Sequence, residues 1–324
     1  YILVDVRSPL EYAESTITGA INIPLFSNEE RAHVGTVYKL EGKSAAVKLG
    51  VDYVSQSLPP IYDSFKQADE KQKKFLIFCA RGGMRSEAVG SFLSSIGFSV
   101  VKLDNGYKGY RQHVITRLPQ LIDDIETVTL FGKTGTGKTH ILHELQKAGH
   151  NVLDLEGYAG HRGSVFGGLG LVQRSQKQFE TCLYDALSNA KPGVFFTEGE
   201  SRRIGKIYMP KELLDKMNSG RKLLIEADLE TRKNIIYQDY VESEFDKNDA
   251  IKALSSLLRY IGHERIKEYS TLVETGQLET LIEELMVKYY DIVYNTLHTP
   301  YEKAFINQDS AKTAAEIARY ILTE

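Results

Sequence analysis

The segment CARGGMRS, residues 79–86, places one of the two cysteines of the chain at the start of a loop that could bind an anion. The apolar stretch KFLIF precedes the loop and a helical pattern follows it, so backbone amides would face the thiol of Cys79 and favour the thiolate. Two glycines allow a tight turn, and two arginines add positive charge. We therefore predict that Cys79 is a nucleophile, held in an anion-binding loop of Arg81, Gly82, Gly83, Met84, Arg85 and Ser86.

The other cysteine, Cys182, gives a contrast. It lies in FETCLYDAL, which is typical of an amphipathic helix, and we interpret it as a packing residue. A buried, inert thiol is also the alternative interpretation of Cys79, but the glycine and arginine pairs beside it favour a reactive one.

A second anion-binding motif, GKTGTGKT, follows the apolar strand pattern TVTLF and opens a helical pattern, as a P-loop requires. Its backbone amides could surround a diphosphate, Lys138 could bridge the phosphate oxygens, and the Thr139 hydroxyl could hold Mg²⁺. The motif leaves its ligand open, including ATP or GTP. The predicted diphosphate-binding residues are Gly132, Lys133, Thr134, Gly135, Thr136, Gly137, Lys138 and Thr139.

Acidic and basic residues follow the neighbouring strand patterns, where ligands bind in doubly wound sheets. Arg202 and Arg203 could instead be solvated surface residues, and His161 could instead have a structural role. The candidates for supporting or substrate-binding roles are Glu156, His161, Arg162, Glu198, Glu200, Arg202 and Arg203.

Alternating strand and helix patterns must position these loops. One alternation spans about the first 118 residues, and a second begins near residue 126, so we expect two α/β domains with parallel sheets. The segment RQHVITRLPQLIDDIE between them has helical spacing. From Asp228 onward the pattern is helical, and an apolar stripe indicates a core-facing helix at Leu278, Leu281, Ile282, Leu285, Met286 and Tyr289.

Composition limits the class of protein. The net charge of −3 argues against a uniformly basic nucleic-acid binder, although residues 1–120 carry 15 Lys and Arg against 12 Asp and Glu. Two cysteines are too few for a disulfide framework, which favours a reducing, cytoplasmic location. No stretch reaches the roughly 18 apolar residues of a membrane span, so no membrane partner is expected.

The cysteine loop suits two chemistries, persulfide transfer and phosphate-ester hydrolysis, because Cys79 and Arg85 also have the Cys-x5-Arg spacing of phosphatases. The upstream segment DVRSPLEYAESTITGAINIPL resembles the rhodanese signature, which begins with Asp-x-Arg, here Asp5 and Arg7. Phe78 precedes the cysteine, where most tyrosine phosphatases have histidine. This context favours the rhodanese interpretation, with Arg7 as a supporting residue.

The whole chain resembles the bacterial tRNA 2-selenouridine synthases. The matching stretches are VDVRSPLEY, ERAHVGTVYKLEGKSAAVKLG, CARGGMRS, NGYKGYR, GKTGTGKT, LDLEGYAGHRGSVFG and TEGESRRIG. One departure is DNGYKGYR, where the family has Gly-Gly-Tyr-Lys-Ala-Tyr-Arg. The implied fold class is α/β, with a rhodanese-like parallel-sheet domain at 1–118, a P-loop NTPase-like doubly wound core at 119–227 and a helical region at 228–324 packed on that core.

The resemblance implies that the wobble 2-thiouridine of certain tRNAs is first alkylated on sulfur by geranyl diphosphate. Selenium from selenophosphate then replaces the geranylated sulfur. By analogy, Cys79 would handle selenophosphate or a selenium-charged intermediate, and the P-loop would bind the diphosphate. No tightly bound cofactor is expected, Mg²⁺ is allowed at Thr139, and the resemblance also allows a partner enzyme that supplies selenophosphate.

Two further surfaces follow from this implied activity. The geranyl chain needs an apolar pocket, for which VFGGLGLV at 165–172 is a candidate. The tRNA needs phosphate contacts and a stacking side chain, for which the candidates are Lys108, Tyr110 and Arg111, with Lys102 and Tyr107 beside them. Arg202 and Arg203 are further candidates for phosphate contacts. The lysines at 71, 73 and 74 fit a solvated helix end better than an RNA contact.

Two alternatives remain at this level. One is a rhodanese-type sulfurtransferase or Cys-x5-Arg phosphatase that an ATP- or GTP-binding P-loop domain gates. The other is a tRNA-binding or nucleotide-sensing module in which both loops only bind anions. Nucleotide turnover would favour the first, and full function of a Cys79→Ser variant would favour the second.

Overall fold

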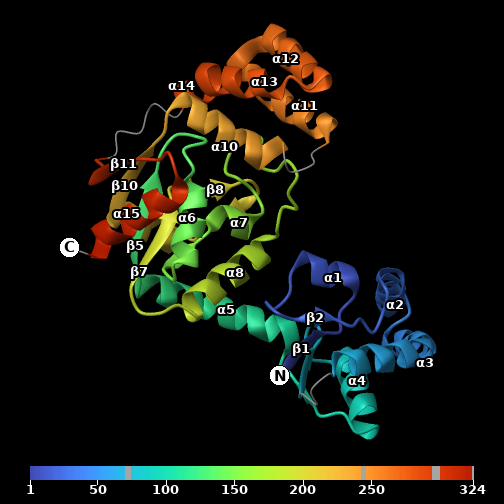
Figure 1. Ribbon diagram of the computed structural model, residues 1–324. Coiled ribbons are helices and arrows are strands. Elements are labelled where there is room, and N and C mark those ends of the chain that lie inside the picture. Colours follow the sequence, from blue (N-terminus) through green and yellow to red (C-terminus); the bar gives the residue numbers. More distant parts are fainter. Residues whose placement is uncertain (70–73, 242–245, 294–299, 323–324) are drawn as a thin grey trace. The chain divides into compact units, whose positions relative to one another are not determined.

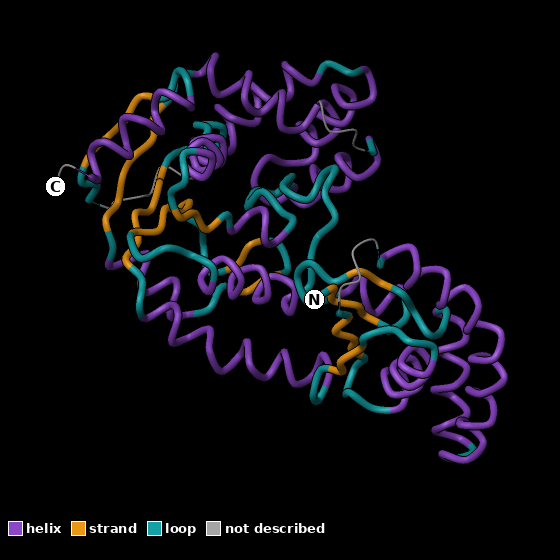
Figure 2. Tube along the Cα trace, turned by 60° about the horizontal axis from the view of Figure 1, so that its bottom comes forward, coloured by secondary structure: helices purple, strands orange, loops and turns teal. Residues whose placement is uncertain are grey.

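A computed structural model describes residues 1–69, 74–241, 246–293 and 300–322 (Figure 1). The chain divides into two compact units. The first comprises Tyr1–Leu118 with Glu180–Cys182, and the second comprises Pro119–Phe179 with Leu183–Glu324. Each unit has its own parallel sheet with helices packed around it (Figure 2).

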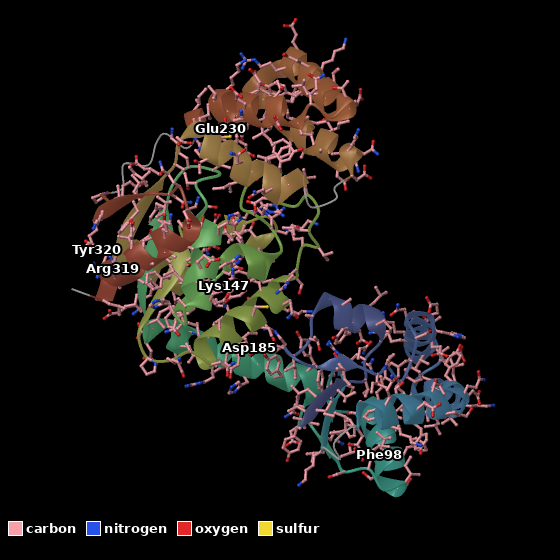
Figure 3. All side chains as sticks on the ribbon, in the orientation of Figure 1. Phe98, Lys147, Asp185, Glu230, Arg319 and Tyr320 are labelled. Atoms are coloured by element: carbon pink, nitrogen blue, oxygen red, sulfur yellow. The ribbon has the colours of Figure 1, made fainter. Side chains whose placement is uncertain are left out.

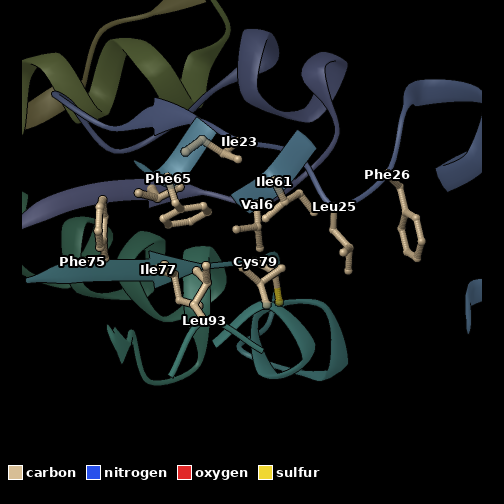
Figure 4. Packing of buried hydrophobic residues seen from close by; sticks show 12 residues of the cluster. Val6, Ile23, Leu25, Phe26, Ile61, Phe65, Phe75, Ile77, Cys79 and Leu93 are labelled. Carbon is tan, nitrogen blue, oxygen red and sulfur yellow. The ribbon is translucent and has the colours of Figure 1, made fainter. Parts of the chain in front are cut away.

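The first unit contains a four-stranded parallel sheet in the order β2-β1-β3-β4. Its core holds fully buried apolar side chains from both strands and helices, including Phe65, Ile77 and Leu93 (Figure 4). Its elements are β1 (Ile2–Asp5), α1 (Pro9–Glu14), β2 (Ile21–Asn22), α2 (Asn28–Leu40), α3 (Lys43–Ala68), β3 (Phe75–Phe78), α4 (Met84–Ser95), β4 (Val100–Lys102) and the start of α5 (Gly106–Asp123).

Helix α3 continues through Pro59 and Pro60, where the sequence suggests a boundary between two helices. Buried Ile61 and Phe65, one turn apart, pack into the core just after the prolines. This packing holds the second half of the helix in line with the first. Helix α5 likewise contains Pro119 and forms the helix expected between the two alternations.

The second unit contains a five-stranded parallel sheet in the order β11-β10-β5-β7-β6, with β5 in the centre. Its elements are β5 (Glu126–Phe131), α6 (Lys138–Lys147), β6 (Asn151–Leu153), α7 (Leu155–Ala159), α8 (Gln176–Ser188), β7 (Val194–Glu198), a hairpin of β8 (Arg203–Ile204) and β9 (Ile207–Tyr208), α9 (Lys211–Ser219), β10 (Arg221–Glu226), α10 (Leu229–Val241), α11 (Lys247–Ser256), α12 (Leu258–Thr275), α13 (Leu278–Leu285), the π-helical turn η1 (Met286–Tyr290), α14 (Asp291–Val293), β11 (Lys303–Ile306) and α15 (Ser310–Leu322).

Strand β11 was not expected, because the sequence pattern after Asp228 indicates helices. The strand is only four residues long, and Phe305 is its one buried side chain, so it carries no clear alternating pattern. It pairs in parallel with β10 through the main chain. Helix α15 then packs against α6 and completes the core on that side of the sheet, with Ala314 and Ile317 buried.

Helices α10 to α13 and η1 enclose a second apolar cluster, which includes Leu254, Tyr269, Val273 and Leu285. The predicted apolar stripe forms α13 and η1 and faces this cluster, as the sequence indicates. Among the described helices, none has the length and hydropathy to cross a membrane.

Candidate active sites

Cys79 follows the last residue of β3, and α4 begins five residues later, as the sequence predicts (Figure 4). The cysteine side chain is 3 % exposed, but it is not packed only against apolar groups. Its Sγ lies 3.2 Å from the Ser86 hydroxyl, and the backbone amides of Arg81 and Ser86 face it. The loop therefore provides donors for a negatively charged sulfur.

Burial of Cys79 opposes ionisation of the thiol, but the hydrogen bonds outweigh it. The Ser86 hydroxyl, the amides of Ser86 and Arg81, and the charge of Arg85 together lower the pKa of Cys79 below its ordinary value. The Cys79 thiolate is thus more populated near neutral pH than that of an ordinary cysteine.

Replacing Ser86 by alanine should raise the pKa of Cys79, because a hydrogen bond from the Ser86 hydroxyl stabilises the thiolate more than the thiol. In a Cys182→Ser background, the pH profile of Cys79 alkylation by iodoacetamide should move to higher pH, and the rate at pH 7 should fall several-fold. Ser95→Ala, an exposed change later in α4, is the control. An unchanged profile in Ser86→Ala would contradict this assignment.

The start of α5 supports the cysteine loop. The amides of Tyr107 and Lys108 donate to the carbonyls of Cys79 and Ala80 at 2.8 and 2.9 Å. A side chain on Gly106 would lie 2.2 Å from the Cys79 carbonyl oxygen, so this close approach requires glycine.

The departure of DNGYKGYR from the family pattern has a structural reason. Asn105 adopts a positive φ of 56°, which asparagine tolerates, at the position where the family has glycine. A Cβ on Gly109 would lie 2.8 Å from the Asn105 Cβ, and Gly109 replaces the alanine of the family. The two changes therefore accommodate each other.

Two arginines predicted near the anion have protein partners. Arg85 forms a two-point ion pair with Glu11, at 2.6 and 3.2 Å. Arg7 is 4 % exposed, donates to Asp5 and stacks 4.0 Å from the ring centre of Tyr107. Arg7 thus ties the end of β1 to the start of α5, and of the supporting and substrate-binding roles predicted for it, this packing favours the supporting one. Arg85 acts on the sulfur through its charge.

The predicted RNA contacts are only partly available. Arg111 is 8 % exposed and pairs with Glu180, so it cannot reach a phosphate, which corrects the prediction. Tyr107 is buried and cannot stack on a base, whereas Lys108 is exposed and Tyr110 is half-buried. The remaining lysines differ: Lys102 pairs with Glu87, Lys74 is exposed, and Lys71 and Lys73 lie outside the described residues.

An open groove lies beside the cysteine loop, between α2, α3 and the start of α4. Apolar side chains such as Val34, Val54 and Met84 line it. Basic side chains also line the groove and are suited to nucleic-acid phosphates, namely Arg31, Lys39, Lys43 and Arg81.

The second loop has P-loop geometry between β5 and α6. Lys138 Nζ donates to the carbonyls of Gly132 and Lys133, at 3.0 and 3.3 Å, and Thr139 Oγ1 donates to Glu156 at 3.1 Å. Gly137 has a φ of +82°, and a Cβ there would meet Asn307 at 2.4 Å. The remaining residues of the predicted loop also lie at this turn. Thr134, Gly135 and Gly137 line a pocket beside it, which we call the phosphate pocket.

Residues that the sequence analysis missed hold this loop in place. Buried Arg232 of α10 donates to the Thr134 carbonyl at 2.9 Å and forms a two-point ion pair with Asp291, which also binds Lys133. Asn307, at the end of β11, donates to the Thr136 carbonyl at 2.9 Å. These residues come from α10, α14 and the end of β11, and no local pattern marks them.

Replacing Asp291 by asparagine should destabilise the second unit by about 1–3 kcal/mol, because it leaves the Arg232 guanidinium without its anionic partner. Burial opposes ionisation of Asp291, but the Arg232 guanidinium and, to a lesser extent, the Lys133 ammonium hold its pKa below the ordinary value. The stabilisation is therefore present at neutral pH and is lost as the pH falls through the lowered pKa.

The measurement is the midpoint of unfolding in urea. The transition of the second unit is recognised because added pyrophosphate shifts it. The midpoint of Asp291→Asn is compared with that of Asp249→Asn, an exposed control. A wild-type midpoint for Asp291→Asn would refute the anchoring role.

Three predicted carboxylates lie beside Lys138. Glu156 and Glu200 line the phosphate pocket, and Glu198 lies beneath it, fully buried, with Oε1 accepting from the Glu156 amide at 2.9 Å. Burial and the neighbouring Glu200 raise the pKa of Glu156 to about 8, and burial also raises the pKa of Glu198. Glu198 thus positions Glu156 and does not reach the pocket.

No cluster of three or more His, Cys, Asp or Glu side chains with metal-binding geometry occurs within the described parts of the chain. A Mg²⁺ ion at Thr139 would accordingly depend on phosphate oxygens for most of its ligands. The residues present fit such an ion only as a companion of a bound diphosphate.

Of the basic residues predicted outside the P-loop, namely His161, Arg162, Arg202 and Arg203, Arg162 lines the phosphate pocket. Arg202 and Arg203 are exposed at the β8–β9 hairpin, where Arg203 stacks on Tyr208, so neither lines the pocket and both remain candidate RNA contacts. His161 packs against Gly167 and Gly205, and burial, aided by the charge of Arg162, lowers its pKa. The structure therefore favours a structural role for His161.

Each of the two units matches a known protein family. Residues 1–113 match the rhodanese-like domain, and residues 125–323 match the tRNA 2-selenouridine synthase AAA domain. The tRNA 2-selenouridine synthase of Hydrogenovibrio crunogenus is 34 % identical over 90 % of this chain and 88 % of its own length. The chain belongs to the tRNA 2-selenouridine synthase family.

Other tRNA 2-selenouridine synthases match over a similar extent. That of Marinobacter nauticus is 32 % identical over 98 % of this chain and 94 % of its own length. That of Sulfurovum sp. is 30 % identical over 90 % and 87 %. Because tRNA 2-selenouridine synthases are enzymes, the chain is an enzyme, with a rhodanese-like domain followed by a P-loop domain, as the sequence predicts.

Proposed function

We propose that this enzyme converts the wobble 2-thiouridine of tRNA to 2-selenouridine in two steps, through an S-geranyl intermediate. The proposal is carried by one observation. The same chain contains a P-loop and a cysteine, Cys79, whose pKa is lowered by hydrogen bonds. Two free cysteines and a tRNA substrate support a cytoplasmic location.

In the first step, the thiouridine sulfur attacks C1 of geranyl diphosphate, the C1–O bond breaks and the diphosphate leaves with the bonding electrons. Lys138 and the P-loop amides are placed to stabilise the charge on the departing diphosphate. The base must also lose its N3 proton, and Glu156 and Glu200 are the carboxylates of the same pocket that could accept it.

In the second step, the selenium of selenophosphate attacks C2 of the base, the C2–S bond breaks, and the geranyl thiolate leaves and takes up a proton. Water then attacks phosphorus, the P–Se bond breaks, and phosphate is released from the 2-selenouridine. Alkylation of the sulfur makes this departure easier, since an alkyl thiolate is a better leaving group than a thiocarbonyl sulfur. The Cys79 loop is suited to selenophosphate or a selenium-charged intermediate because its amides and Arg81 favour anions. Lys108, Tyr110 and the basic rim of the neighbouring groove are the candidate tRNA contacts.

The test is to incubate the enzyme with thiolated tRNA, geranyl diphosphate and selenophosphate and to identify the wobble nucleoside by mass spectrometry. The expected products are the S-geranyl nucleoside without selenophosphate and 2-selenouridine with it. Nucleotide turnover without any change to the base would instead support a P-loop-gated sulfurtransferase or phosphatase.

A further inference from the structure

An apolar cavity lies beside the P-loop, within the second unit. Its lining comes from the loop at 164–169, from α10 to α13 and from η1, and ten of its fourteen lining side chains are aliphatic, Phe or Met. The cavity volume is about 70 Å³, so a larger ligand must either displace lining side chains or extend into the mouth. Among the lining residues are Phe166, Ile236, Ala250, Val273, Leu281 and Met286.

The cavity and the phosphate pocket share part of their walls. Thr134, Ser164, Ile236 and Tyr240 line both, and Thr134 belongs to the P-loop itself. A ligand with its phosphates on the P-loop amides could therefore extend into the cavity without crossing solvent. The two spaces together fit a molecule with an anionic head and an apolar tail.

We propose that this cavity binds the isoprenoid chain of a prenyl diphosphate whose diphosphate occupies the P-loop. The inference rests on the proposed function and adds the location of the chain. It also refines the expectation for residues 165–172, because Phe166 and Leu169 line the cavity whereas Val172 is 89 % exposed.

The polar groups of the cavity argue against a nucleobase. Ser164 Oγ and Tyr240 Oη form a hydrogen bond with each other at 3.0 Å, near the mouth. Deeper in, a base would face Val273, Leu281 and Leu285, which offer its ring nitrogens and exocyclic groups no partner. An isoprenoid chain has no such groups, so it loses nothing on entering.

The junction of the two spaces is built around Arg162. Its guanidinium lies 4.8 Å from the ring centre of Tyr240 and donates to the Leu169 carbonyl at 3.0 Å. The arginine thus holds the 164–169 loop against the cavity. It also places a positive charge where the bond between the chain and the diphosphate would break.

The lining also offers a means of fitting a flexible chain. Met286 and Tyr290 belong to the π-helical turn η1, a form of helix that often occurs at functional sites. Methionine adapts readily to the shape of an apolar ligand. The predicted stripe of α13 therefore lines a ligand cavity in addition to packing the core.

The test is to compare binding of geranyl diphosphate, dimethylallyl diphosphate and inorganic pyrophosphate by calorimetry. Ala250→Phe should fill part of the cavity and lower the affinity for geranyl diphosphate at least tenfold. The affinity for pyrophosphate should stay within twofold of that of the wild type. The five-carbon dimethylallyl ester should be affected less than the ten-carbon geranyl ester. Val287→Phe, next to Met286 but 49 % exposed and outside the lining, is the matched control.

Met286→Ala is the second variant, because it enlarges the cavity where Ala250→Phe fills it. It should raise the affinity for the fifteen-carbon farnesyl diphosphate, relative to that for geranyl diphosphate, by at least threefold. If the wild type prefers geranyl diphosphate to pyrophosphate and neither variant changes the preference, the cavity assignment is wrong and the proposed function stands. If the wild type shows no such preference, the prenyl donor of the proposed function is wrong as well.

Discussion

Replacing Cys79 by serine is expected to abolish selenation while geranylation of the tRNA continues. Serine keeps the size of the side chain but remains protonated, so the amides of Arg81 and Ser86 no longer face an anion. The rate of 2-selenouridine formation should fall by about a thousandfold or more. The S-geranyl nucleoside should accumulate in its place.

The assay uses thiolated tRNA with both donors, and mass spectrometry measures both nucleosides over time. Cys182→Ser is the matched control, because it removes the other cysteine, which is half-buried. Wild-type selenation by Cys79→Ser would show that the loop only binds an anion. Loss of both products would show that Cys79 serves the first step too.

Replacing Lys138 by alanine should slow geranylation and leave selenation nearly unchanged, the reverse of the pattern expected for Cys79→Ser. The lysine is the cationic side chain of the loop that lines the phosphate pocket, and its loss should slow geranyl transfer by about a hundredfold or more. Lys138 also opposes the burial that raises the pKa of Glu156 and Glu200. Both carboxyls should therefore become harder to ionise in the variant.

Selenation of a tRNA that already carries the S-geranyl group should proceed in Lys138→Ala at nearly the wild-type rate. Lys147→Ala, at the exposed end of the same helix (Figure 3), is the control for loss of a lysine. Unimpaired geranylation by Lys138→Ala would separate the P-loop from the prenyl donor. An equal loss of both steps would contradict the division of labour between the two loops.

The two anion-binding loops are predictable from the sequence because each is a local motif. The residues from Cys79 to Ser86 and from Gly132 to Thr139 adopt their turns through neighbouring glycines and the helix that follows. The parallel sheets are predictable for a similar reason, since buried strands and amphipathic helices alternate along the chain.

The partners of the charged side chains are not predictable in this way. Arg85 binds Glu11, 74 residues earlier, and Arg232 binds Asp291, 59 residues later. A sequence pattern shows that an arginine is present but not whether a carboxylate neutralises it. For this reason the prediction that Arg111 contacts RNA was wrong, whereas Arg232, Asp291 and Asn307 were missed.

The bond from Asn307 to the Thr136 carbonyl spans 171 residues, and it has a consequence for biosynthesis. Translation at about 5–20 residues per second would separate the emergence of these two residues from the ribosome by roughly ten to thirty seconds. During that interval the nascent chain would contain a P-loop that lacks its β11 support. The P-loop therefore gains this support only after residue 307 has been synthesised.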